Sequence, residues 1–136
     1  MNLRLVVISP EKKVLEMDCL SVTLPTVEGE ITILPKHTWL FSLLKPGEII
    51  AKSKNEEISL AVGGGFVNVG PDKVTVLPEF GIKTNEIDEE KVKEAKQRAE
   101  DILKNKLDEE GSALAQASLA RSLLELKIVQ KRRKRL

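Results

Sequence analysis

The residues from which most catalytic and metal sites are built are scarce in this chain. Its 136 residues include one cysteine, one histidine and no tyrosine. A single cysteine, Cys19, excludes a disulfide within the chain and fits a reducing compartment, and we expect it to be a small buried thiol. His37 has no cysteine, serine or acid at a spacing that would make a metal cage or a nucleophile pair. We therefore expect His37 to order a loop through a hydrogen bond, and we expect no enzyme active site.

Long apolar runs and an excess of charge are also missing. No run approaches the roughly 18 apolar residues needed to cross a bilayer, and residues 1–4 lack the layout of a signal peptide. We expect a protein that is soluble, or peripheral to a membrane that it does not enter. The 22 basic and 21 acidic residues give a net charge of +1. The chain as a whole is therefore not expected to bind polyanions, although residues 131–135 form a basic run.

Proline is absent beyond Asp88, and the spacing of apolar residues changes just before that point. Up to about Leu77 the apolar residues alternate with a period of two, whereas beyond Asp88 they recur at the period of an α-helix. We interpret residues 78–88 as a hinge between a β-sandwich domain at 1–84 and a helical hairpin domain at 85–136.

Short alternating segments in the first half predict an antiparallel β-sandwich or flattened barrel, because no helical pattern separates them. Gly63-Gly64-Gly65 is not followed by Lys-Ser or Lys-Thr at the spacing of a phosphate loop, and we interpret it as a strand bend or bulge. Trp39 is either a core residue or an interface anchor, and the sequence leaves both open. The expected strands lie near residues 3–7, 14–17, 20–24, 31–33, 49–52, 58–62, 66–69 and 74–77.

Two helices are expected in the second half. Asp88 can cap the first helix, which should end near residues 105–106, and residues 108–112 offer an acidic start to the second. Small residues on the facing surfaces would let the helices dock or separate at small cost, since an alanine methyl contributes well under ~1 kcal/mol; alanine chosen for helix propensity is the alternative. The predicted apolar stripes are Val92, Ala95, Ala99, Ile102 and Leu103, then Leu114, Ala117, Ala120 or Arg121, Leu124 and Ile128; the predicted small facing residues are Ala95, Ala99, Ala113, Ala117, Ser118 and Ala120.

One stretch resembles the "E-G-E/D … P-x-H … L-x-P-G" signature of the epsilon-subunit family of F-type ATP synthases. It comprises residues 28–37, EGEITILPKH, followed by residues 43–47, LLKPG. The resemblance extends along the chain through residues 62–69, 73–77 and 94–100. It implies a non-catalytic central-stalk subunit that couples proton-driven rotation to ATP synthesis and restrains ATP hydrolysis through a mobile helical hairpin.

The same resemblance implies partners and contact residues. The sandwich would grip the gamma subunit and rest on the ring of c subunits, and an extended second helix would meet acidic segments of the beta subunits in the alpha/beta catalytic head. The implied gamma and c-ring contacts are Glu28, Glu30, Lys36, His37 and Trp39. The implied inhibitory contacts are Arg121, Lys127, Lys131, Arg132 and Arg133.

No cofactor is implied, but some bacterial members of the family bind ATP as a regulatory ligand through an "I/L-D-x-x-R-A" motif and arginines on the second helix. The corresponding candidates here are Ile87, Asp88, Lys91, Arg98 and Arg121. Lysine at 91 lacks the planar fork of arginine, and Glu125 would repel phosphate. Both departures weaken the candidate ATP site.

Lys36 and Thr38-Trp39 also depart from the family, which commonly has Gly before the histidine and Ala-Pro after it.

A second class of function rests on the basic run alone, namely a nucleic-acid or anionic-membrane binding module. Three Phe and one Trp offer few platforms for base stacking, so the stalk-subunit reading, with no nucleic-acid partner, is favoured. A stalk subunit would lie peripherally at the cytoplasmic face of a bacterial plasma membrane, or alternatively at the stromal face of a thylakoid membrane.

Overall fold

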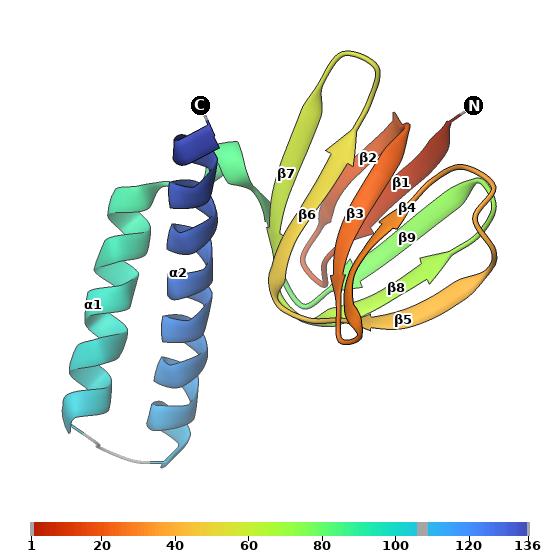
Figure 1. Ribbon diagram of the computed structural model, residues 1–136. Coiled ribbons are helices and arrows are strands. Elements are labelled where there is room, and N and C mark those ends of the chain that lie inside the picture. Colours follow the sequence, from red (N-terminus) through yellow and green to blue (C-terminus); the bar gives the residue numbers. More distant parts are fainter. Residues whose placement is uncertain (1, 106–108, 136) are drawn as a thin grey trace. The chain divides into compact units, whose positions relative to one another are not determined.

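The computed structural model describes residues 2–105 and 109–135, with side chains as far as residue 133 except at 109 and 110. The chain divides into two compact units, Met1–Thr84 and Asn85–Leu136. The first is a β-sandwich that approaches a closed barrel, and the second is a pair of helices (Figure 1). The predicted fold class is therefore confirmed.

The strands of the first unit are short, and most of the connections between them contain glycine, proline or serine. Their order is β10-β7-β6-β3-β5-β8-β9-β1-β2, with β4 paired to β3. All pairs are antiparallel except β1 with β9. The bounds are β1 (Leu3–Ile8), β2 (Lys13–Cys19), β3 (Ser21–Thr26), β4 (Gly29–Ile33), β5 (Leu40–Leu44), β6 (Gly47–Lys52), β7 (Glu57–Val62), β8 (Gly65–Val69), β9 (Lys73–Pro78) and β10 (Gly81–Lys83).

The core of the sandwich is built from the inward residues of these strands. Leu3, Leu5 and Val7 of β1 are fully buried, and the core cluster continues through the other strands as far as Val76. Cys19 is 1% exposed within it, as predicted. Burial raises the pKa of the Cys19 thiol to about 11, with a smaller contribution from the negative charge of Asp18. The thiol therefore stays protonated, and so poorly nucleophilic, at neutral pH.

Two strands were not predicted, and one of them corrects the proposed hinge. Gly81–Lys83 pairs with Val62, Ala61 and Leu60 of β7, so this part of the 78–88 stretch belongs to the sheet. Three residues are too few to show a period of two. The strand Leu40–Leu44 is hidden for a different reason: its run of apolar residues masks the alternation, although Leu44 points inward and Phe41 and Leu43 point outward.

Gly63-Gly64-Gly65 forms the predicted bend, which joins β7 to β8. The Gly63 N–H donates to the Phe80 carbonyl oxygen at 3.0 Å. A Cβ at Gly63 would lie 2.6 Å from the Phe80 ring, so any larger residue there would have to displace that ring.

The second unit is an antiparallel hairpin of α1 (Glu89–Asn105) and α2 (Glu109–Arg135), preceded by a 3₁₀ turn, η1 (Thr84–Glu86). The helices lie side by side (Figure 1). Asp88 caps α1 as predicted, because its Oδ1 accepts hydrogen bonds from the N–H groups of Glu90 and Lys91 at 3.1 and 3.3 Å. The predicted boundary residues Lys106 and Asp108 lie outside the described residues.

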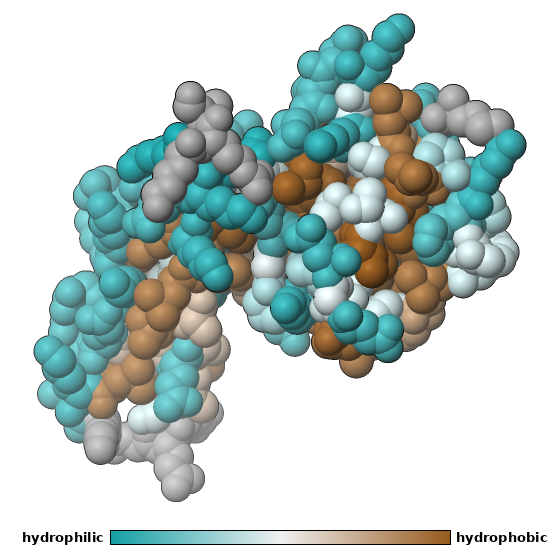
Figure 2. Space-filling model, in the orientation of Figure 1, coloured by the Kyte–Doolittle hydropathy of each residue, from teal (hydrophilic) through white to brown (hydrophobic). Residues whose placement is uncertain are grey.

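The predicted buried stripe of α2 is wrong in its first half, whereas Ile128 is buried as predicted and Leu124 is half-buried. Leu114 is 70% exposed, and Ala113, Ala117, Ser118 and Ala120 are exposed as well. Apolar residues occur on several sides of α2, so the sequence period does not single out one face. Figure 2 shows apolar residues gathered in a strip along the hairpin between hydrophilic margins. The residues of α2 that the structure buries are Ala115, Ser122, Glu125, Leu126 and Ile128.

Across the described residues, neither helix is both long enough and apolar enough to span a membrane.

Candidate functional site

The outer surface of β5, β8, β9 and β1 carries a continuous row of apolar side chains. Leu43 lies opposite Phe66, and Phe66 lies opposite Leu77. Val7 is paired with Val76 in the parallel β1–β9 ladder, which brings Ile8 beside Leu77. These four side chains are each between 38% and 47% exposed.

Phe41 extends this row along β5. Its ring is 65% exposed and stacks on Phe66 with ring centroids 5.7 Å apart and an interplanar angle of 25°. We call Ile8, Phe41, Leu43, Phe66 and Leu77 the apolar face. Isolated apolar residues are common on protein surfaces, but a contiguous group of this kind typically marks a contact with a partner.

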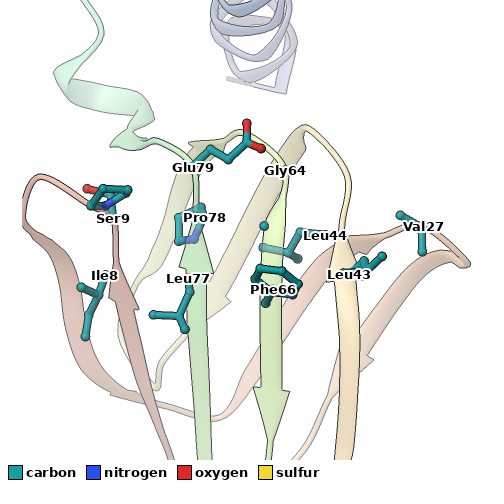
Figure 3. A pocket seen from close by; sticks show the side chains of 12 residues that line it. Ile8, Ser9, Val27, Leu43, Leu44, Gly64, Phe66, Leu77, Pro78 and Glu79 are labelled. Carbon is teal, nitrogen blue, oxygen red and sulfur yellow. The ribbon is translucent and has the colours of Figure 1, made fainter.

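An open groove of about 690 Å³ lies at one end of the apolar face. Figure 3 shows Leu43, Phe66 and Leu77 side by side on its floor, with Val27 and Glu79 at its margins. Glu79 is the one charged residue among those that line the groove. Its N–H donates to the Gly64 carbonyl oxygen at 2.7 Å, which fixes the backbone that carries the carboxylate.

The same outer surface becomes charged on β2, where Lys13 lies opposite Ile8, and toward the start of β1. Arg4 is paired with Glu16 at 2.7 Å and with Asp18 at 3.1 Å, and Lys13 is paired with Glu16 at 2.6 Å. The Lys13 ammonium and then the Arg4 guanidinium lower the pKa of Glu16 to about 2. An apolar partner surface would therefore end where this ion-pair cluster begins.

The predicted gamma and c-ring residues do not form one patch. Glu28 lies in the β3–β4 turn and Glu30 in β4, whereas Lys36, His37 and Trp39 lie in the loop at 34–39, beyond the other end of β4. A strand of this length spans about 17 Å. The turn that holds Glu28 is tied to the groove end of β5 by a hydrogen bond from Val27 N–H to the Leu43 carbonyl oxygen at 3.0 Å.

The loop at 34–39 is fixed against the β8–β9 turn. Lys36 N–H donates to the Pro71 carbonyl oxygen at 2.6 Å. Trp39 lies over Gly70, where a Cβ would come within 2.9 Å of its ring, yet the indole remains 75% exposed. His37 Nδ1–H donates to the Thr38 carbonyl oxygen at 2.6 Å, which agrees with the predicted role in ordering the loop.

Several candidate nucleotide residues already make other contacts. Asp88 caps α1, and Arg121 Nε is paired with the buried Glu125 carboxylate at 2.8 Å. Lys91 and Arg98 are exposed and lie seven residues apart, hence on one side of α1. Ile87 is half-buried ahead of the helix. The acid that stands beside Arg121 makes this part of the hairpin less favourable for a phosphate.

The cations of α2 differ in their surroundings. Lys127 and Lys131 are exposed and lie four residues apart on one face, and Arg132 is half-buried. Arg133 forms an ion pair with Glu89 at the start of α1. The candidate inhibitory surface therefore carries both positive and negative charge at the end of the hairpin that contains the start of α1 and the end of α2.

Sequence reasoning missed the apolar face. The available signal was apolar residues at outward positions, namely Phe41 and Leu43 around Ser42 and Phe66 next to Val67. Such positions are normally polar in a sandwich. Among the described residues, no group of three or more His, Cys, Asp or Glu side chains could hold a metal ion.

Residues 2–83 match the family model "ATP synthase, Delta/Epsilon chain, beta-sandwich domain", and residues 85–130 match "ATP synthase, Delta/Epsilon chain, long alpha-helix domain". The ATP synthase epsilon chain of Dehalococcoides mccartyi is 41% identical over 134 residues, which cover 98% of this chain and 96% of the relative. That of Vesicomyosocius okutanii is 40% identical over 127 residues, covering 93% and 92%.

Solved structures resemble the fold. A chain of the Euglena gracilis mitochondrial ATP synthase aligns with a TM-score of 0.65 and 22% identity, covering 95% of this chain and 78% of that one. A chain in the central stalk and c-ring structure of the Tetrahymena thermophila enzyme aligns with a TM-score of 0.58 and 18% identity, covering 95% and 97%. At these identities the likeness concerns the fold alone.

Proposed function

The chain belongs to the ATP synthase delta/epsilon chain family, and on that premise we propose that it serves as the epsilon subunit in the central stalk of an F-type ATP synthase. In this role it catalyses no reaction itself. It transmits rotation between the ring of c subunits and the gamma subunit during ATP synthesis. The relatives named epsilon chain match it over nearly their whole length, which supports the proposal for both units together.

The apolar face carries the proposed contact with gamma. It offers aromatic and aliphatic side chains on a rigid sheet, and a partner that covers it removes these side chains from water. The loop at 34–39, with Lys36, His37 and Trp39, is the proposed contact with the c ring, since it lies beyond the other end of β4. The complex would hold the protein peripherally at the cytoplasmic face of the membrane.

The hairpin carries the proposed inhibition of ATP hydrolysis. An extended α2 would present basic residues to acidic segments of the beta subunits, where opposite charge favours binding. These residues are Arg121, Lys127, Lys131, Arg132 and Arg133. Regulation by ATP is the less supported part of the proposal, because Asp88 and Arg121 are engaged elsewhere and Glu125 lies beside Arg121. The nucleic-acid alternative gains no support from the basic run at 131–135, in which Arg133 already has an acidic partner within the hairpin.

The gamma contact is tested by placing a charge on the apolar face. We expect Phe66→Glu and Leu77→Glu in the full chain to weaken binding to a purified gamma subunit by at least about tenfold, because burying an unpaired carboxylate is costly. Leu20→Glu is the matched control: Leu20 is similarly exposed but lies between β2 and β3, off the apolar face. Circular dichroism would verify that each variant is folded.

Two outcomes would contradict the proposal at different levels. Binding that survives both apolar-face substitutions would place the gamma contact elsewhere on the chain. A wild-type chain that binds no gamma subunit would remove the assignment to the stalk altogether.

A further inference from the structure

The two helices of the hairpin meet along a seam of residues spaced alternately three and four apart. This spacing keeps side chains on one side of each helix. The middle of the seam is made of small residues, with Ala99 and Ser122 both buried. The positions on α1 are Glu89, Val92, Lys96, Ala99 and Leu103, and those on α2 are Ala115, Leu119, Ser122, Leu126, Val129 and Arg133.

Glu89 and Arg133 form an ion pair at the outer end of this seam. The two residues are 44 positions apart in the sequence, and the pair joins the first turn of α1 to the end of α2. Antiparallel helices have the same rise per residue, so ten steps inward from each member bring Ala99 close to Ser122 and Leu123. The ion pair and the small-residue contact are therefore parts of one register.

Small residues bury little area, so the middle of the seam holds the helices together weakly. The Glu89 side chain is only 16% exposed. Without Arg133, this carboxylate would stay partly buried with no opposite charge beside it, which is less favourable than an exposed carboxylate. The end of α2 is thus held by the ion pair together with the apolar seam residues Leu126 and Val129.

We propose that the Glu89–Arg133 pair is a latch that holds the end of α2 against α1 and competes with acidic partners for Arg133, whose side chain is otherwise 67% exposed. Glu89 takes, within the chain, the place that an acidic side chain of a partner would take. The inference deepens the proposed inhibitory role of the hairpin and rests on it only for the identity of the partner. The latch itself is a property of the isolated chain.

The latch is tested by comparing Glu89→Gln with Glu90→Gln in the full-length chain. Both changes remove one negative charge from the first turn of α1 and so weaken its interaction with the helix dipole equally. Only Glu89 has the cross-helix partner; Glu90 is exposed and forms no ion pair among the described residues. The readout is amide hydrogen exchange in residues 126–133, measured by mass spectrometry.

We expect Glu89→Gln to speed exchange in residues 126–133 by about two- to five-fold, the range typical of a partly exposed ion pair, and Glu90→Gln to leave it unchanged. Adding Arg133→Glu to Glu89→Arg should slow exchange again relative to Glu89→Arg alone. High salt should shrink the difference between Glu89→Gln and the wild type. Equal exchange in the two Gln variants, or no recovery in the reversed pair, would overturn the latch.

The competition for Arg133 has its own readout. A decaglutamate peptide should bind Glu89→Gln more tightly than the wild type, and Arg133→Gln should abolish that gain. Equal peptide binding to Glu89→Gln and the wild type would overturn the competition for Arg133 even where exchange changes as expected. Neither measurement includes a gamma subunit, so failure of the latch and failure of the stalk assignment are distinguishable.

Discussion

At the scale of a single residue, the backbone of Lys36 is unusual. Its φ angle is +67°, and it is the one non-glycine residue with a positive φ in the described part of the chain. L-residues other than glycine reach this left-handed region at a cost of roughly 1–2 kcal/mol. The hydrogen bond from Lys36 N–H to Pro71 at 2.6 Å helps hold the conformation. The epsilon-subunit family commonly has glycine at this position. Glycine adopts a positive φ without strain, which explains that preference physically.

We predict that Lys36→Gly stabilises the protein by about 0.5–1 kcal/mol, since relief of the backbone strain exceeds the added entropy of the unfolded chain. The measurement is the midpoint of urea unfolding at unchanged m-value. Lys36→Ala is the control, because it removes the side chain but keeps the Cβ that causes the strain. Lys36→Gly no more stable than Lys36→Ala would mean that the loop stores no strain there.

Trp39 shows why some residues of the site cannot be placed from sequence. Its ring packs on Gly70, which lies in the β8–β9 turn and is 31 positions away, and most of it faces water. No local period reports such a contact, so the sequence left core and interface open. The alternation of inward residues such as Leu3, Leu5 and Val7, by contrast, directly predicted a strand.

At the scale of elements, the connection from β7 to β8 depends on glycine at 65. A Cβ at Gly65 would overlap the Leu77 carbonyl oxygen and lie 2.7 Å from the Pro78 Cα. Both atoms belong to the backbone of β9, which is paired with β8 and cannot move aside without breaking the ladder. Gly64, one residue earlier, has only an ordinary contact, with 3.4 Å from its ideal Cβ to the Leu44 carbonyl oxygen.

We therefore predict that Gly65→Ala costs about 2 kcal/mol or more of unfolding free energy, whereas Gly64→Ala changes it by less than about 1 kcal/mol. Urea unfolding followed by circular dichroism compares the two variants under the same conditions. Equal stability of both would show that β9 accommodates the methyl group. Because Phe66 and Leu77 flank this connection, Gly65→Ala should also disturb the apolar face.

Some elements could be predicted because a local sequence pattern identifies them. Others were missed because no local pattern does. Alternation identified the strands with one polar face, and Asp88 marked the start of α1 through its capping oxygen. The strand Leu40–Leu44 carries apolar residues on both faces because its outer face belongs to the apolar face. The buried side of α2 is selected by contacts with residues far away in sequence, so Leu114 was placed inside when it lies outside.

At the scale of the whole molecule, the sandwich is complete at Thr84. Every residue of its buried core cluster lies between Leu3 and Val76. The Thr84 Oγ1 and Ser59 Oγ lie 2.6 Å apart, and Ser59 Oγ donates to Glu48 at 2.5 Å. These contacts end the sheet with satisfied polar groups just after β10. A chain that stops after Thr84 keeps all of them, whereas one that stops after Pro78 loses β10 and bares the edge of β7.

We predict that fragment 1–84 folds cooperatively and binds the gamma subunit like the full chain, and that fragment 1–78 is markedly less stable and prone to aggregate through the uncovered edge. In a reconstituted catalytic head, fragment 1–84 should permit faster ATP hydrolysis than the full chain, because the proposed inhibitory residues are gone. Thermal unfolding, gamma binding and the hydrolysis rate test the three parts separately.

A hydrolysis rate equal to that with the full chain would remove the inhibitory role while leaving the stalk contact intact. A fragment 1–84 that fails to fold would instead show that the sandwich requires the helical unit for its stability.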